Sequence, residues 1–243
     1  MILKELAKRG DDIFFETPTQ PCSNLLAYQN VHSERLVKFL STAWDRWDAL
    51  GTAGQDPSSS TSPLSIGEKE TEGISPPLIP GSSALPRDPY QCPSQNVMGQ
   101  IGFFCMDTLD TCTPVIALLK EELLWDGAVV QQAVASIQNH KVVYALATHP
   151  GHHAAKDSFG GYCYLNHAAF ATHLLQNSGY LKVAVLDIDY VRRRKAKLTC
   201  HFDGCFYFVS STNIFLLSAM MIFIFSTVEM GLHPFFMRIL RYS

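Results

Sequence analysis

The spacing of apolar residues predicts several amphipathic helices along the chain. One covers residues 34–50, where Ser33 can cap the first turn and Gly51 lies just past the end. The same periodicity predicts a helix over residues 113–136 and another over residues 166–177. The first of these predicted helices lies before residues 52–100, and the other two follow that segment.

Two runs of almost continuous apolar residues predict strands that are buried on both faces. They are V-V-Y-A-L-A at residues 142–147 and K-V-A-V-L-D at residues 182–187. A predicted helix lies between them, and this order is typical of a βαβ unit with a parallel sheet, so the fold class is α/β. In such sheets chemistry gathers at the carboxyl ends of the strands. Four residues of catalytic type follow or finish these strands: His152, His153, Asp187 and Asp189.

Residues 52–100 differ from the rest of the chain. They are rich in serine, proline and glycine, with runs such as S-S-S-T-S-P and I-S-P-P-L-I-P-G-S-S. Structureless loops of this length are uncommon inside compact domains. The segment is therefore either a linker or a long functional loop.

Composition and charge narrow the class of protein. The 243 residues are 47% hydrophobic, which is enough for a sizeable core in one large or two small domains. The net charge of −3 gives no electrostatic reason to expect nucleic-acid binding. Seven scattered cysteines favour a reducing compartment, and the N-terminus lacks the apolar core of a secretory signal. We therefore expect a cytoplasmic or nuclear location.

Residues 147–166, A-T-H-P-G-H-H-A-A-K-D-S-F-G-G-Y-C-Y-L-N, carry the candidate chemistry. Adjacent histidines cannot both face one way on a regular strand, but in a loop His152 and His153 can line one cleft. Each imidazole needs a partner at its other ring nitrogen, and a carboxylate suits this best. Asp187 and Asp189 lie two apart on a strand and so project to the same side. One carboxylate could orient an imidazole while the other binds a cation.

These motifs resemble those of the zinc-dependent histone deacetylase family, and most closely its acetylpolyamine amidohydrolase-like branch. That branch typically reads R-P-P-G-H-H-A, then G-G-Y-C-Y-L-N-N-A-A, then a strand ending D-x-D-x-H-H-G-N-G-T. This chain has T-H-P-G-H-H-A, G-G-Y-C-Y-L-N-H-A-A and D-I-D-Y. The resemblance covers residues 1–190. It implies the N-terminal portion of an arginase/deacetylase-type three-layer α/β fold with a parallel sheet.

The resemblance also implies a role for each matching residue. His152 and His153 correspond to the paired histidines that activate the attacking water and protonate the leaving amine. Asp187 corresponds to the carboxylate that hydrogen-bonds the first histidine and helps to bind a structural K⁺. Asp189 corresponds to the first Zn²⁺ ligand.

A second group of residues corresponds to the substrate tunnel of the family. Gly160, Gly161 and Tyr162 match its walls, where a missing side chain lets the acyl-lysine stem pass and an aromatic ring packs on it. Asp107 lies near the place of a carboxylate at the tunnel rim. The implied substrates are acetylated lysine in proteins or acetylpolyamines. Residues 52–100 match an insertion that shapes the tunnel entrance and a homodimer contact.

The chain departs from the family pattern immediately after Tyr190. Val191 stands where the family has its histidine zinc ligand, and Arg194 stands where a carboxylate would partner the second histidine. Catalytic zinc normally has three protein ligands and a water. Because Asp189 alone cannot hold zinc at useful affinity, we expect the chain to bind no zinc and to be inactive as an enzyme.

Residues 191–243 show no resemblance to the family, which divides the chain into a partial deacetylase-like domain at 1–190 and a tail. Within the tail, residues 205–228 carry no charge and are long enough to span a bilayer behind a basic run. One hypothesis is therefore a tail-anchored membrane protein. The hypothesis that we favour is a retained intron or gene-model error that truncates the domain after Tyr190.

Three functions are consistent with these patterns. The leading interpretation is a truncated zinc deacetylase, and the second is a non-catalytic product that binds a partner or blocks its full-length sibling. The third is the membrane-anchored protein. A parallel sheet that is cut short leaves an open edge, so we also expect poor solubility.

Overall fold

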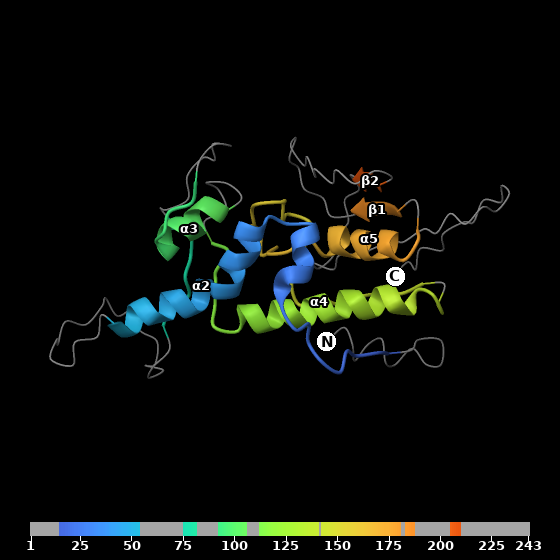
Figure 1. Cartoon of the computed structure of the whole chain (residues 1–243), viewed down its shortest axis with the longest axis horizontal. Coiled ribbons are helices and arrows are strands. Elements are labelled where there is room, and N and C mark those ends of the chain that lie inside the picture. Colours follow the sequence, from blue (N-terminus) through green and yellow to red (C-terminus); the bar gives the residue numbers. More distant parts are fainter. Residues whose placement is uncertain are drawn as a thin grey trace, which may run out of the picture.

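The computed structural model describes residues 15–53, 75–81, 92–105, 112–140, 142–180, 183–187 and 205–209, and the fold is given for these residues. In chain order the elements are the 3-10 helix η1 (Leu25–Asn30), the α-helices α2 (Glu34–Ala53), α3 (Val97–Phe104), α4 (Leu119–Ser136) and α5 (His167–Asn177), and the strands β1 (Val183–Asp187) and β2 (Cys205–Val209). Figure 1 shows α5 packed between the long helix α4 and the strand pair, with α2 crossing near the start of α4 and α3 lying beside α2.

The sheet that the structure describes is a parallel pair, β1 and β2. Val183 pairs with Cys205 at one end of the ladder, and Asp187 pairs with Val209 at the other. β2 lies at the start of residues 205–228, the stretch long enough to span a membrane. Its five residues form a strand rather than a helix. In the part of the chain that the structure describes, no helix is long and apolar enough to cross a membrane.

The prediction of a buried strand over residues 142–147 is wrong. These residues form no strand, and Val142 and Tyr144 are 83% and 44% exposed. An apolar run becomes a buried strand only where a neighbouring strand pairs with it, and the strand pair among the described residues is β1 with β2. The parallel pairing that was predicted is present, but between different segments of the chain.

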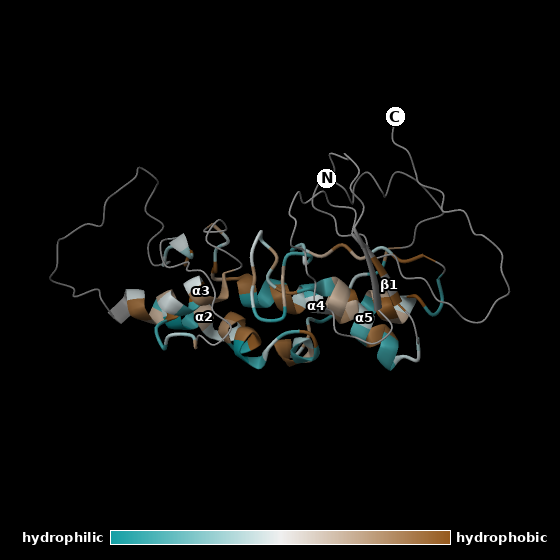
Figure 2. Cartoon of the chain, turned by 90° about the horizontal axis from the view of Figure 1, so that it is seen from above, coloured by the Kyte–Doolittle hydropathy of each residue, from teal (hydrophilic) through white to brown (hydrophobic). Residues whose placement is uncertain are grey.

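Helix α2 begins where the sequence predicts. The Ser33 hydroxyl accepts a hydrogen bond from the Leu36 amide at 3.2 Å, which satisfies one of the unpaired donors of the first turn. The helix continues to Ala53, so Gly51 lies within its last turn and not beyond its end. The buried face of α2 consists of Leu36, Val37, Phe39, Leu40 and Ala43. Polar and apolar positions both appear along this helix in Figure 2, as its amphipathic pattern requires.

Helix α4 begins later than predicted because a long-range backbone pairing occupies the residues before it. Val115 and Leu78 exchange two backbone hydrogen bonds, of 2.7 and 2.9 Å, in an antiparallel bridge. Val115 therefore lies outside the helix, which starts at Leu119. Leu78 is 1% exposed, so part of the serine- and proline-rich region is built into the core.

An aromatic cluster in the core connects three segments that surround the candidate site. Phe39 of α2 lies 5.0 Å from Phe104 of α3 and 6.2 Å from Phe159, measured between ring centroids. Phe159 lies 5.7 Å from Tyr164 in turn. Buried aromatic pairs of this kind contribute about 0.5–1.5 kcal/mol each beyond their buried area. The cluster therefore fixes the segment that carries G-G-Y-C against the helices.

Candidate active site

The tandem histidines lie in the loop that leads into α5. The His152 and His153 rings are both half-buried, with centroids 4.1 Å apart and planes inclined by 50°. A loop permits this arrangement, whereas a regular strand would send the two side chains to opposite faces. The structure therefore brings the two imidazoles together.

A tight turn places a bare backbone against one of these rings. Gly161 and Tyr162 both have positive φ, of 56° and 61°, and Gly160 and Cys163 close the turn with two backbone hydrogen bonds of 3.1 and 2.9 Å. A Cβ on Gly161 would lie 2.5 Å from His153 Cδ2, well inside contact distance. Glycine is therefore required here both by the backbone conformation and by the imidazole.

Tyr162 is the exposed tip of the same turn. Its side chain is 56% exposed, although a non-glycine residue at positive φ costs about 1–2 kcal/mol. The Tyr162 amide donates a hydrogen bond to the Thr113 hydroxyl at 3.2 Å, which helps to hold this conformation. The turn thus presents an aromatic ring to solvent next to Gly161, the residue that lies against His153.

A buried histidine anchors the chain downstream of the pair. His32 Nδ1 donates to the Ala155 carbonyl at 2.8 Å, and its Nε2 accepts from the Asn166 amide at 2.9 Å. These partners require a neutral ring with the proton on Nδ1. Burial lowers the pKa of His32 to about 4, which agrees with that neutral state.

Asp157, which also follows the histidine pair, ties the loop to residues at the start of α2. Arg35 Nε donates to Asp157 Oδ1 at 2.9 Å, and a second guanidinium nitrogen donates to Oδ2. The Ser33 hydroxyl also donates to Asp157, and the Ser33 amide donates to the Lys156 carbonyl at 2.6 Å. The loop after the histidines is therefore tied to the beginning of α2.

A buried carboxylate anchors the chain upstream of the pair. Asp126 of α4 accepts hydrogen bonds from the Thr148 amide at 2.6 Å, the His149 amide at 3.2 Å and His149 Nδ1 at 2.8 Å. Burial raises the pKa of Asp126, but these donors and the nearby His167 outweigh it and hold the pKa below its ordinary value. Asp126 is therefore ionised at neutral pH.

These anchoring residues were not predicted from the sequence. An aspartate amid the apolar L-L-W-D-G-A of α4 was one signal, because such residues are seldom buried without partners. A second signal was His167, because this chain reads L-N-H-A-A where the family pattern reads L-N-N-A-A. The Tyr28 hydroxyl lies 2.9 Å from His167 Nδ1, and burial lowers the pKa of His167 to about 4.

Of the three carboxylates that the family resemblance implies, Asp187 is the one that lies within the described residues. Asp187 is the last residue of β1, while Asp107, Asp189 and Val191 lie outside the described residues. Within the described ranges no three histidine, cysteine, aspartate or glutamate side chains are grouped to hold a metal ion. A catalytic zinc needs about three protein ligands, and the side chain of Val191, two residues after Asp189, has no donor atom. Position 191 therefore supplies no side-chain ligand, and the loss of zinc binding stays a prediction.

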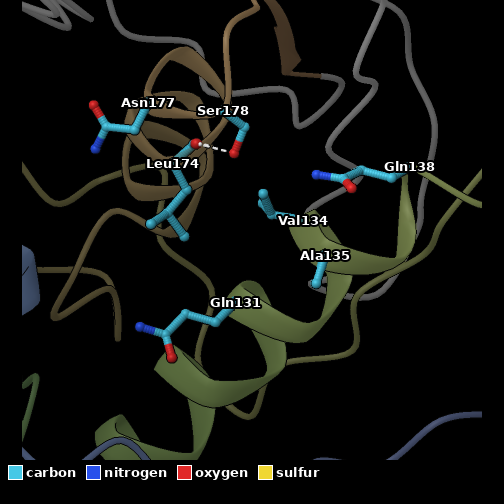
Figure 3. Close-up of a pocket in the computed structure, with 7 residues that line it drawn as sticks. All are labelled: Gln131, Val134, Ala135, Gln138, Leu174, Asn177 and Ser178. Atoms are coloured by element: carbon cyan, nitrogen blue, oxygen red, sulfur yellow. Dashed lines mark hydrogen bonds between the residues drawn. The ribbon is translucent and has the colours of Figure 1, made fainter.

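A groove between α4 and α5 lies apart from the histidines. It has a volume of about 350 Å³, and none of its lining residues belongs to the histidine loop or the glycine turn. Figure 3 shows the lining side chains, which are Gln131, Val134, Ala135, Gln138, Leu174, Asn177 and Ser178. The Ser178 hydroxyl donates to the Leu174 carbonyl at 2.9 Å.

The helices, the parallel strand pair and the tandem-histidine loop define an α/β protein of the deacetylase class. A family model described as the histone deacetylase domain matches residues 2–190, and the chain belongs to this family. Both the family resemblance and the fold class inferred from the sequence are thereby confirmed.

Similar proteins point to one branch of this family. The acetylpolyamine amidohydrolase of Mycoplana ramosa is 34% identical over 163 residues, which cover 66% of this chain and 40% of that protein. Acetylpolyamine amidohydrolase 1 of Pseudomonas aeruginosa is 30% identical over 196 residues, covering 76% of this chain and 49% of that protein. The chain thus spans about half or less of the length of these relatives.

A solved structure supports the fold. The acetylpolyamine aminohydrolase of Burkholderia pseudomallei superposes with a TM-score of 0.59 at 21% identity, over 86% of this chain and 52% of that one. At this level of identity the likeness is one of fold.

Proposed function

We propose that the chain carries the acid–base and tunnel half of a deacetylase site without its zinc centre, and that it binds an acetylated amine without hydrolysing it. The observation that supports this most is the contact between Gly161 and the His153 ring, because a side chain at Gly161 would fill the space beside the imidazole. The names of the relatives suggest acetylpolyamine as the ligand, and acetyl-lysine has the same neutral amide on an aliphatic stem.

Each group in this half-site has a role that its chemistry allows. His152 and His153 lie close enough to share work as proton acceptor and donor at one reacting centre. Tyr162 offers an exposed ring against which an aliphatic stem can pack. Asp187 remains our candidate for the carboxylate that orients His152, with a K⁺ ion beside it. Asp107 remains our candidate for the carboxylate at the rim of the substrate tunnel.

Hydrolysis requires more than this half-site supplies. In the family zinc would polarise the acetyl carbonyl and lower the pKa of the attacking water. Val191 offers no ligand atom at the position where that zinc would be held. We therefore propose binding rather than turnover.

The experiment measures binding and hydrolysis in the same samples of the full chain. A fluorescent acetyl-lysine peptide and N-acetylputrescine are titrated with and without added Zn²⁺, with the non-acetylated peptide as control. We expect acetyl-dependent binding and no turnover under either condition. Zinc-dependent turnover would contradict the loss of the metal centre, and equal binding of the non-acetylated peptide would contradict the tunnel.

We further propose that residues 52–100 contribute to a homodimer contact. Residues 75–81 are fixed to the body of the protein, since the Trp47 indole donates to the Pro76 carbonyl at 2.7 Å and Ser75 donates to Asp48 at 2.6 Å. Residues 75–81 are therefore part of the folded body, and the proposal concerns the segment to which they belong. Light scattering should show a dimer for the full chain and a monomer after deletion of residues 54–74. Unchanged mass would rule out this contact.

A further inference from the structure

The carboxylate of Asp126 joins α4 to the loop that carries the tandem histidines. Its three hydrogen bonds come from two consecutive amides, Thr148 and His149, and from the His149 ring. The Asp126 side chain is 2% exposed. A buried carboxylate is costly without donors, so the ionised group strongly favours the loop conformation that supplies all three.

The imidazole of His149 is held from more than one side. Its Nε2 lies 3.4 Å from a carboxylate oxygen of Glu122, one turn before Asp126 on the same helix. Its ring lies edge-on to Tyr164, with centroids 5.0 Å apart and planes at 90°. The position of His149 is therefore set by α4 and by the aromatic core together.

The short connection from His149 to His152 transmits this position. It consists of Pro150, whose ring fixes φ, and Gly151, which packs tightly on the start of α5. A Cβ on Gly151 would lie 2.8 Å from both the Leu165 carbonyl oxygen and the His167 amide nitrogen. The connection has little room to absorb a shift, so movement at His149 would move the imidazole of His152.

A second buried histidine faces the same carboxylate. His167 Nε2 is buried and has no hydrogen-bond partner among the described residues, and it lies 3.8 Å from Asp126 Oδ2. In the tautomer whose Nδ1 accepts from the Tyr28 hydroxyl, the proton is on Nε2, the ring nitrogen nearer to Asp126. This arrangement also favours a negative charge at Asp126.

We propose that Asp126 is the positioning residue of the histidine pair, which it controls through the backbone at residues 148–149. The proposal rests on the proposed function, in which His152 and His153 form the acid–base pair. Asp126 is buried and acts through the loop rather than on the substrate. Its effect on the histidines depends on the charge of the carboxylate as well as on the shape of the side chain.

The test compares Asp126→Asn with a matched control, Glu122→Gln, in the full chain. Asp126→Asn keeps the shape of the side chain but loses the charge and one acceptor, whereas Glu122→Gln changes only a partner of the His149 ring. Diethylpyrocarbonate modifies accessible neutral imidazoles, and peptide mass spectrometry gives a rate for each histidine. His173, also half-buried but on α5, reports on general unfolding.

We expect Asp126→Asn to raise the rates at His152 and His153 by about tenfold relative to His173, since a lost hydrogen bond to a charged group favours the open loop by that order. Glu122→Gln should change them little. Unchanged rates at His152 and His153 in folded Asp126→Asn would overturn the proposal. If that variant does not fold, His149→Phe decides, because it removes one donor and keeps a ring against Tyr164.

Failure of this proposal can be distinguished from failure of the proposed function. Absence of acetyl-dependent binding in the wild-type chain would contradict the proposed function. The diethylpyrocarbonate modification rates at His152 and His153 would still report on the position of the loop. A change of His152 and His153 rates in equal proportion to His173 would show general unfolding and count against a positioning role.

Discussion

Gly161 and His153 are in direct contact, such that a Cβ on the glycine would lie 2.5 Å from the imidazole carbon Cδ2. The glycine belongs to a turn whose backbone has positive φ, and the histidine belongs to the loop before α5. The contact therefore links the two motifs of the sequence, G-H-H and G-G-Y-C, into one site. A single methyl group at this position tests the link.

Gly161→Ala should destabilise the protein by at least about 2 kcal/mol, since it combines a strained φ with a clash against His153. The matched control is Gly81→Ala, because Gly81 has a similar φ of 47° but no atom within 4 Å of the added Cβ. The control should cost only about 1 kcal/mol. Urea unfolding measures both. Equal losses in the two variants would show that strain alone, and not the imidazole, requires the glycine.

Tyr162→Asn should separate stability from binding. Asparagine tolerates positive φ better than tyrosine, so the free energy of unfolding should stay within about 0.5 kcal/mol or rise slightly. Loss of the exposed ring should weaken binding of the acetyl-lysine peptide by about tenfold, as truncation of an aromatic anchor commonly does. The two measurements are chemical unfolding and peptide titration. Binding as tight as that of the wild type would remove Tyr162 from the tunnel.

Local patterns were enough to locate α2, α5 and the tandem histidines. Ser33 caps α2 as predicted, and Asn166 caps α5 through a hydrogen bond from the Ala169 amide to its side chain at 3.0 Å. Caps and amphipathic periodicity involve residues within a turn of each other, so the sequence shows them directly. The motifs around His152 and His153 are similarly compact.

Features that depend on distant residues could not be read in this way. The start of α4 is set by the pairing of Val115 with Leu78, and the partner of β1 among the described residues is the distant β2 rather than residues 142–147. Asp126 gains its role only when α4 lies beside the histidine loop. Apolar periodicity shows that a segment will be buried or paired, but not which segment will pair with it.

Leu78→Ala should test whether part of the serine- and proline-rich region belongs to the core. Leu78 is 1% exposed and paired with Val115, so truncation should cost about 2–5 kcal/mol in the free energy of unfolding. The adjacent Ile79 is 47% exposed, and Ile79→Ala should cost less than about 1 kcal/mol. Similar losses for both variants, measured by urea unfolding, would mean that residues 75–81 do not pack as described.

His32 and His167 should make stability fall as the solution becomes acidic. The folded-state pKa of each is about 4, below the ordinary value of 6.5, because burial disfavours the charged ring. Between these values the unfolded chain binds protons that the folded chain does not, so stability rises with pH. Each histidine contributes a slope of up to about 1.4 kcal/mol per pH unit in this window. The lowered pKa of Asp126 acts in the same direction, but below its ordinary value of 3.8.

His167→Asn removes one of these two groups and isolates its share of the slope. Asparagine does not titrate, so the slope of unfolding free energy between pH 4.5 and 6.5 should fall to about half of the wild-type value. Urea unfolding at closely spaced pH values measures the slope, and His173→Asn serves as the control, because His173 is only half-buried on α5. A slope that stays unchanged in His167→Asn would mean that His167 is not held neutral by burial beside Asp126.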